Sequence, residues 1–259
     1  MKWTVQSAGA RNNRTPFKPN EDFCIADAEN GVFIVADGVT MGGAVYPEDT
    51  EKSEPGMAAE IAAASVREGL LAHADAEEGL REGLRLAVQR CASLAQERPT
   101  EYPACACLVA CCIRGGKVYC GYMGDSQAFL LRGNARLMLT ENQTARLDAY
   151  YRAHGNRPDK RYIYNHITNR IEHPLHYGVV MGDMRTMDML VVSSMALEAG
   201  DRLIVTTDGL DRYLLFTPLE EQKRKTPAEM IAESTPYDVP PYGRYADDKS
   251  IITVDIESV

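Results

Sequence analysis

Short, nearly uninterrupted apolar runs recur along the chain and are separated by polar turns. Runs of this kind are typical of strands that are buried on both faces. They predict strands at residues 32–36, 104–113, 118–123, 127–131, 137–139, 203–206 and 251–256. The segment 132–134, Arg-Gly-Asn, lies between two of these runs and predicts a hairpin turn.

Apolar residues recur at helical spacing between the first predicted strand and the second. The two sets are Met57, Ile61, Ala64 and Ser65, and then Leu80, Leu84, Val88, Cys91 and Leu94. Thr-Pro followed by glutamate, at 217–220 and 226–229, predicts two further helices that begin with a capping box. We expect irregular structure at 40–55, 154–187 and 235–246.

The predicted strands are grouped beside helices and do not alternate with them. This order favours an α+β architecture with antiparallel sheets. We find no internal repeat and no linker, so we expect a single domain over residues 1–259. A chain of this length can bury a large core without disulfides.

Composition and charge exclude several classes of protein. The chain is 45% hydrophobic and 25% charged, as in ordinary globular proteins, and its net charge is −9. This acidic balance argues against binding to nucleic acid or to an anionic membrane. The longest apolar run is too short to span a bilayer, and the N-terminus lacks the apolar core of a signal peptide. We therefore expect a cytoplasmic protein.

Six of the seven cysteines lie between Cys91 and Cys120, and none forms a C-x-x-C pair, which argues against a zinc site. Cys105, Cys107 and Cys111 share one parity along a predicted strand and should point to one face. We interpret them as reduced core residues, because free cysteine is often buried. A redox switch is the alternative.

Acidic residues stand at the ends of several predicted strands. Asp37, Asp125 and Asp208 each follow a strand, Asp247 precedes the last one, and Glu21-Asp22 stands ahead of the first. A single Asp-Gly is typical of a turn. If these ends converge, however, the carboxylates would repel one another and raise one another's pKa values. Divalent cations bound by oxygen ligands would relieve that repulsion.

Four of these residues, Glu21, Asp37, Asp208 and Asp247, carry the charge that two dications would neutralise. Two metals about 3.5–4 Å apart can turn a bridging water into a nucleophile and can neutralise phosphate oxygens. Such a site needs no serine or cysteine nucleophile.

The ordered set of motifs resembles the metal-dependent serine/threonine protein phosphatases of type 2C, in a bacterial-like form. The matching motifs span residues 20–256 and are Asn20-Glu21-Asp22, Val35-Ala36-Asp37-Gly38 with Gly42-Gly43, Gly124-Asp125-Ser126, Leu139-Thr140, Thr207-Asp208-Gly209-Leu210 and Asp247-Asp248-Lys249-Ser250. The resemblance implies a sandwich of two antiparallel β-sheets flanked by helices. It also implies two magnesium or manganese ions at one edge, with a weaker third.

The resemblance also implies a role for each matching residue. Asp37 would bridge both metals and the Gly38 carbonyl would bind one of them. Asp208 and Asp247 would bind the other, and Asp125 would contribute to the third. Glu21 would hold water or metal at the second site, with Asp22 in support. On this basis Asp37, Glu21 and Asp208 are the residues expected to act in catalysis.

The chain departs from the family pattern where phosphate is bound. Phe17 stands where the family has an arginine, four residues before Glu21. Arg14 and Lys18 are the nearby candidates for gripping phosphate, and the planar guanidinium of Arg14 suits phosphate better. Val39 replaces the histidine of eukaryotic members, and Gln127 replaces the usual arginine after Gly-Asp-Ser.

The region 154–187 corresponds to a segment that often forms a mobile flap in the family. Its histidines, His166, His173 and His176, could include a general acid, but surface or locally bonded histidines are the commoner case. The basic residues in and just before this region, Arg152, Arg157, Lys160 and Arg161, could meet a phosphopeptide, although a solvated charged face is the commoner case.

The resemblance implies a phosphoprotein substrate and an opposing serine/threonine kinase. Two other functions remain open from the sequence. One is a non-catalytic module that binds phosphoproteins or regulates them, and the other is a phosphomonoesterase that acts on a small molecule.

Overall fold

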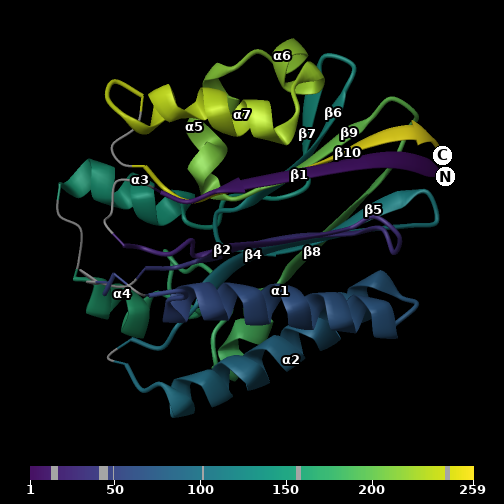
Figure 1. Ribbon diagram of the computed structural model, residues 1–259. Coiled ribbons are helices and arrows are strands. Elements are labelled where there is room, and N and C mark those ends of the chain that lie inside the picture. The colour runs from purple at the N-terminus through teal and green to yellow at the C-terminus, as the bar shows by residue number, and fades with distance from the viewer. Residues whose placement is uncertain (13–16, 41–45, 49, 101, 156–158, 243–245) are drawn as a thin grey trace.

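A computed structural model describes residues 1–12, 17–40, 46–48, 50–100, 102–155, 159–242 and 246–259 (Figure 1). Two five-stranded antiparallel sheets stack on each other. The first has the order β1 (Lys2–Ala10), β10 (Lys249–Ser258), β9 (Arg202–Thr206), β6 (Gln127–Arg132) and β7 (Ala135–Met138). The second has the order β2 (Asp22–Asp27), β3 (Val32–Gly38), β4 (Ala106–Arg114), β5 (Lys117–Met123) and β8 (Val191–Ala196).

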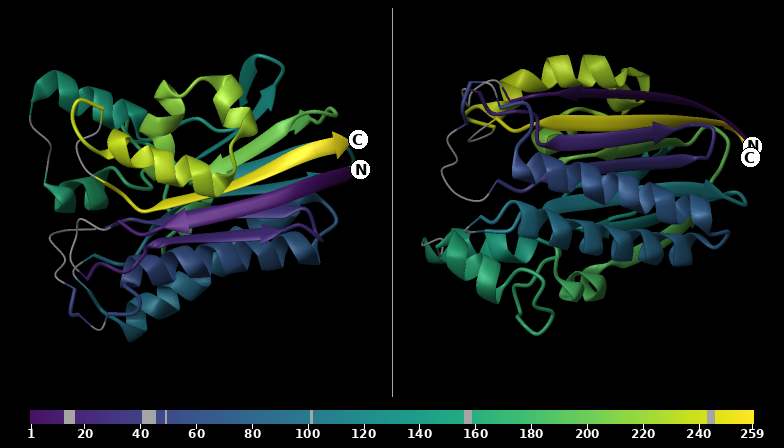
Figure 2. Two further views of the ribbon diagram at one scale, coloured as in Figure 1. Left: turned by 45° about the horizontal axis from the view of Figure 1, so that its top comes forward. Right: turned by 60° about the horizontal axis from the view of Figure 1, so that its bottom comes forward.

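Helices cover the outer faces of both sheets, which gives four layers (Figure 2). The second sheet is covered by α1 (Glu54–Ala72) and α2 (Ala76–Glu97). The first is covered by α5 (Asp211–Phe216), α6 (Leu219–Arg224) and α7 (Pro227–Ser234). The remaining elements are α3 (Ala145–His154), α4 (Lys160–His166) and the 3₁₀ turns η1 (Met184–Met189), η2 (Asp208–Leu210) and η3 (Thr235–Asp238). Among the described residues, no helix combines the length and apolar character needed to cross a membrane.

One hydrophobic core lies between the two sheets, where side chains such as Val35, Val109, Leu130 and Ile252 are fully buried. The alternate residues of β3 and β4 face α1 and α2 and are buried as well. Because these strands are covered on both faces, their sequences read as continuous apolar runs. The predicted sandwich of two antiparallel sheets flanked by helices is confirmed.

Three strands were not predicted, and all three lie at sheet edges: β1, β2 and β8. Residues of β1 and β8 are partly exposed along their length, so polar residues interrupt their apolar pattern. The continuous-run criterion therefore detects the central strands and misses three of the four edge strands, since only β7 was predicted, as 137–139. The hairpin predicted at 132–134 joins β6 to β7.

The two predicted capping boxes have different outcomes. At the start of α7 the Thr226 hydroxyl accepts a hydrogen bond from the Glu229 N–H, and the Glu229 carboxylate accepts one from the Thr226 N–H. The capping box predicted there is therefore present. At Thr217 no box forms, and α6 begins after Pro218 without a side-chain cap. The region 154–187, predicted as irregular, contains α4 and most of the turn η1.

All seven cysteines are free thiols, and six of them are buried. Cys111 lies in the core between the sheets, and Cys105 and Cys107 pack together with Val179 and Met181. Burial raises the pKa of Cys105 to about 12, which keeps this thiol protonated and unreactive. The structure therefore favours their interpretation as core residues.

Strand register brings the acidic strand ends to one end of the sandwich. Lys249 at the start of β10 pairs with Ala10, and Thr206 at the end of β9 lies between Ile251 and Gln127. In the other sheet Asp22 pairs with Asp37. The chain termini lie together at the opposite end (Figure 1).

The crossing of α1 and α2 generates a stability prediction. A Cβ at Gly83 would lie 2.5 Å from the Cα of Val66 in the facing helix. Alanine normally favours a helix interior by about 1 kcal/mol over glycine, but here it would force the helices apart. Gly83→Ala should therefore destabilise the protein by about 1–3 kcal/mol, measured by urea unfolding. Gly9→Ala is the control, because its Cβ would meet only ordinary contacts at 3.4 Å and beyond. An unchanged or raised free energy of unfolding for Gly83→Ala would contradict the close crossing.

Candidate metal centre

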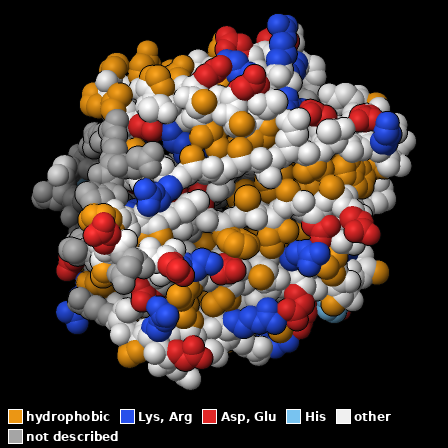
Figure 3. All heavy atoms as spheres, in the orientation of Figure 1, with side chains coloured by type: hydrophobic (Ala, Val, Ile, Leu, Met, Phe, Trp, Pro, Cys, Tyr) orange, Lys and Arg blue, Asp and Glu red, His pale blue; other side chains and the backbone are white. Residues whose placement is uncertain are grey.

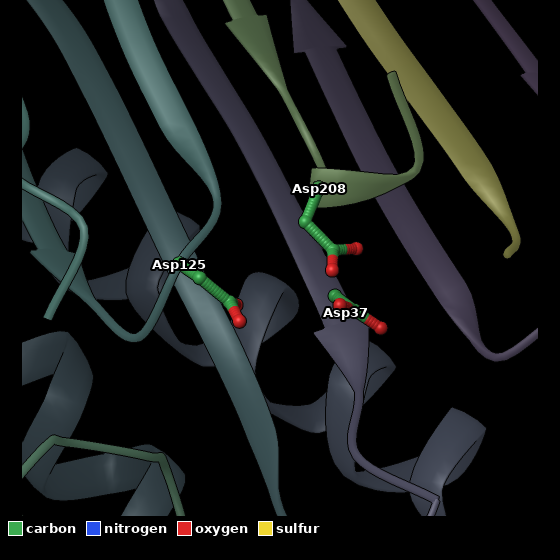
Figure 4. Close-up of side chains that lie close together, drawn as sticks. All are labelled: Asp37, Asp125 and Asp208. Atoms are coloured by element: carbon green, nitrogen blue, oxygen red, sulfur yellow. The ribbon is translucent and has the colours of Figure 1, made fainter. Parts of the chain in front are cut away.

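Three aspartates meet at the end of the sandwich that lies opposite the termini. Asp37 ends β3, Asp125 lies in the turn between β5 and β6, and Asp208 follows β9. One carboxylate oxygen from each lies within 4.8 Å of those from the other two. Figure 4 shows the three side chains gathered in one place from separate elements. The predicted convergence of these carboxylates is therefore present in the structure.

The turn that carries Asp208 is fixed by the neighbouring Thr207. Its backbone N–H donates to the Ser250 carbonyl, and its hydroxyl accepts from the Ser250 N–H at 2.9 Å. The same hydroxyl donates to Asp22 Oδ2 at 2.8 Å. Gly209 follows, and a Cβ there would lie 2.0 Å from the Asp248 carbonyl oxygen. The Asp-Gly pair thus allows the backbone at the start of β10 to approach Asp208 closely.

The turn that carries Asp125 is held by one glutamine side chain. Gln143 Oε1 accepts from the Gly124 N–H at 3.1 Å and from the Gly178 N–H at 2.8 Å. Its Nε2 donates to the Met189 carbonyl. Asp125 is thereby connected to residues 178–189, which pack beside the start of β4.

The cluster is electrostatically strained. Burial, with the charges of Asp208 and Asp22, raises the pKa of Asp37 well above its usual value. Burial, with the charges of Asp125 and Asp247, does the same to the pKa of Asp208. Burial also raises the pKa of Asp22 to about 7, against the opposing hydrogen bond from Thr207. These carboxyls cannot all ionise near neutral pH without a compensating positive charge.

Several buried oxygens in the cluster have no hydrogen-bond partner among the described residues: Oδ1 of Asp22, of Asp125 and of Asp208. Buried polar atoms are rarely left in this state. Oxygen donors without cysteine or histidine are the ligands that magnesium and manganese prefer. The residues present therefore fit a hard divalent cation.

Asp247 lies near this cluster but is not one of the three closest carboxylates. Its charge contributes to the raised pKa values of Asp37 and Asp208, so it lies within electrostatic range of both. Burial raises the pKa of Asp247 itself, against the hydrogen bond from the Asp248 N–H and the charge of Lys18. Its role as a ligand stays a prediction, as does that of the Gly38 carbonyl.

Glu21 is buried in a pocket of hydroxyl groups. Its Oε1 accepts from Ser53 at 2.6 Å and from Tyr46 at 2.8 Å, and its Oε2 accepts from Thr40. Lys18 Nζ lies 3.2 Å from the same Oε2. Both oxygens of Glu21 are thus occupied within the protein. A role in holding water or metal stays a prediction.

The two residues predicted to bind phosphate are Arg14 and Lys18. Arg14 lies outside the described residues. Phe17, at the family's arginine position, has a left-handed backbone with φ of 57° and is 48% exposed. Lys18 is buried, and its ammonium lies 2.6 Å from Asp248 Oδ2. Its role as a phosphate donor stays a prediction.

The flap histidines make local contacts. His173 and His176 are joined by hydrogen bonds, and the ring of His166 packs on Tyr162. A general-acid role stays a prediction for all three. Lys160 donates to the carbonyl of Thr40, so α4 touches the segment that follows Asp37-Gly38.

Sequence reasoning missed two acidic residues of this end. Asp211 accepts a hydrogen bond from Gln127 at 2.7 Å, and burial with the charge of Asp125 raises the pKa of Asp211 to about 8. Asp248 was noted only as part of a motif, yet its side chain is 1% exposed and accepts from three donors. Asp211 and Asp248 lie close to Asp208 and Asp247 in sequence, which was the only pattern that could have drawn attention to them. The burial and the hydrogen-bond partners of their side chains depend on tertiary packing.

The chain as a whole is similar to known protein phosphatases. A family model described as protein phosphatase 2C matches residues 11–237. No curated protein sequence matches the chain significantly.

The solved structure of PppA from Pseudomonas aeruginosa is similar, with 18% identity, a TM-score of 0.69 and coverage of 98% of each chain. The serine/threonine phosphatase PstP from Mycobacterium tuberculosis is similar at 19% identity and a TM-score of 0.66, over 98% of this chain and 99% of that one. A PstP catalytic domain in complex with two manganese ions matches at 18% identity and a TM-score of 0.65, over 98% of each chain.

The raised pKa values predict how the stability of the metal-free protein depends on pH. Unfolded aspartates titrate near pH ~4, whereas the folded Asp22 and Asp211 titrate at about 7 and about 8. Between these limits the folded state binds more protons, so the free energy of unfolding should fall as pH rises. Calorimetry in EDTA should therefore give a lower Tm at pH 8 than at pH 5.5.

The matched variant is Asp208→Asn, which removes one charge from the cluster and should reduce this slope. Saturating manganese should also raise Tm most at pH 8. A metal-free Tm that rises from pH 5.5 to pH 8, with the same slope in Asp208→Asn, would rule out a strained carboxylate cluster.

Proposed function

The chain belongs to the protein phosphatase 2C family, whose members are metal-dependent serine/threonine protein phosphatases, and we propose that Asp37, Asp125 and Asp208 form its metal-binding active site. The observation that carries this proposal is the convergence of three carboxylates with unpartnered buried oxygens. A turn-forming role alone does not account for aspartates from both sheets meeting within 4.8 Å.

When bound, two magnesium or manganese ions supply Lewis-acid stabilisation of the phosphate oxygens and a water of lowered pKa. As the family resemblance implies, Asp37 would hold both ions, and Asp208 from the other sheet and Asp125 from the turn between β5 and β6 lie close to its carboxylate. Asp247 and the Gly38 carbonyl would complete the set, and Asp125 would also serve a weaker third ion. Glu21 would orient water at the second ion, with Asp22 in support.

Fixed ligand positions are what such a reaction requires, because the attacking water must lie in line with the leaving group. The hydrogen bonds of Thr207 and Gln143 hold the backbone beside Asp208 and Asp125. Arg14 is our proposed phosphate-binding cation outside the described residues. Its guanidinium can give the paired, charge-assisted hydrogen bonds that a phosphate dianion needs.

The substrate is a phosphoprotein, and we propose that a serine/threonine kinase supplies it. A net charge of −9 argues against a nucleic-acid partner. On the face in Figure 3, basic and acidic side chains are intermixed over α1 and α2, which gives no single basic surface there. We propose a cytoplasmic location and a single phosphatase domain over residues 1–259.

Substitution of a proposed ligand tests the function directly. Asp208→Asn keeps the side-chain shape but loses the charge that holds the cation. The kcat on a phosphothreonine peptide should fall at least about 100-fold, since loss of a mere supporting partner of a metal ligand already costs 10–100-fold. The exposed Asp188→Asn is the control. Near-normal kcat in Asp208→Asn would remove this residue from the ligand set.

Metal removal gives a second prediction. Hydrolysis of p-nitrophenyl phosphate should stop after EDTA treatment and gel filtration and should return with manganese, because no protein nucleophile replaces the metal-activated water. Full activity after exhaustive metal removal would exclude the proposed mechanism. Hydrolysis of p-nitrophenyl phosphate without hydrolysis of phosphopeptides would favour a small-molecule substrate, and manganese binding without either activity would favour a regulatory module.

A further inference from the structure

Lys18 and Asp248 form an ion pair that is almost completely removed from solvent. Nζ of Lys18 lies 2.6 Å from Oδ2 of Asp248, and their side chains are 8% and 1% exposed. Burial alone would lower the pKa of Lys18, but the hydrogen bond to Asp248 and the charge of Glu21 raise it above its usual value. The pair therefore places an ammonium group inside the protein, where two carboxylates face it.

Asp248 joins two parts of the chain that are far apart in sequence. Its Oδ1 accepts from the Asn12 N–H at 2.6 Å, and its Oδ2 accepts from the Glu21 N–H at 2.9 Å as well as from Lys18. The three donors are Asn12, Lys18 and Glu21. One carboxylate thus fastens these three residues to the start of β10.

Both residues of the ion pair lie next to residues of the proposed metal centre. On one side, Lys18 lies 3.2 Å from Oε2 of Glu21, which three hydroxyls hold in place. On the other side, Asp248 directly follows Asp247, and its carbonyl oxygen occupies the space that a side chain at Gly209 would need. A shift of Asp248 would therefore move Asp247 and the turn after Asp208.

The same contacts limit what Lys18 can do for a substrate. An ammonium has three donors, and carboxylates already face it from Asp248 and Glu21. To grip phosphate, Lys18 would have to leave two buried anions without their cation, and breaking a buried ion pair in this way is strongly unfavourable.

We propose that Lys18 and Asp248 are a positioning pair for the metal centre, and that Lys18 is not the cation that binds substrate phosphate. The pair holds Glu21 and Asp247 at the edge of the three-aspartate cluster. This assignment rests on the proposed function, because it takes that cluster as the metal site.

The test compares Lys18→Met with Lys18→Arg, Asp248→Asn and the double variant Lys18→Met/Asp248→Asn. Three quantities are measured: Tm in EDTA, the Kd of manganese by calorimetry, and the inhibition constant of inorganic phosphate at saturating manganese. Lys18→Met should lower Tm and weaken manganese binding roughly tenfold, the lower end of the effect of ligand-supporting residues. The phosphate inhibition constant should stay within about twofold, because the metals and not Lys18 contact phosphate.

Two comparisons separate positioning from general destabilisation. Lys18→Arg keeps the charge and should recover much of the manganese affinity. The double variant removes the charge of Asp248 together with that of Lys18 and leaves only Glu21 without its cation. It should therefore be more stable than the sum of the single losses predicts. The matched control is Lys249→Met, because Lys249 is equally buried but pairs with Asp238 and Ser234. It should lower Tm while manganese affinity stays within about twofold.

Each opposite result overturns the proposal. A phosphate inhibition constant that rises tenfold or more in Lys18→Met, with unchanged manganese affinity, would make Lys18 the phosphate-binding cation. An equal loss of manganese affinity in Lys249→Met would reduce the effect to general destabilisation. If Lys18→Met does not fold, the double variant and Lys18→Arg still decide the question. If the wild type hydrolyses no phosphoester, the proposed function fails, while Tm and manganese affinity still test the pair.

Discussion

Repulsion between buried carboxylates is the constraint on which the rest of the structure depends. Asp37, Asp125 and Asp208 lie within 4.8 Å of one another, and burial with mutual charge raises the pKa values of Asp37 and Asp208 well above the usual range. Such a cluster works against folding unless positive charge neutralises it. Divalent cations with oxygen ligands supply that charge, and the same ions provide the chemistry of phosphate hydrolysis. The interaction of these carboxylates with divalent cations therefore governs both stability and function.

The fold holds this cluster together through contacts that lie just outside it. The two sheets bring Asp37 and Asp208 face to face, and Gln143 ties the Asp125 turn to residues 178–189. Thr207 connects Asp22 to the start of β10. These hydrogen bonds come from neutral side chains, so they restrain the carboxylates without neutralising them. The cation Lys18 is paired instead with Asp248 beside the cluster.

The sequence predicted the central strands, because strands covered on both faces are continuous apolar runs. The acidic residues could then be located at the ends of these runs. It missed β1, β2 and β8, whose positions at sheet edges leave little continuous apolar pattern. The sequence also did not predict the hydroxyl pocket around Glu21 or the burial of Lys18. Both depend on side chains distant in sequence, such as Ser53 and Asp248, and no local pattern encodes those meetings.

The most direct test of the account is a crystal structure of the protein soaked in manganese, with anomalous scattering recorded at the manganese absorption edge. We expect manganese bound by carboxylate oxygens of Asp37 and Asp208, with Lys18 still paired with Asp248. Manganese absent from this cluster in a soaked crystal, or bound only at surface carboxylates, would contradict the claim that these aspartates form a metal centre.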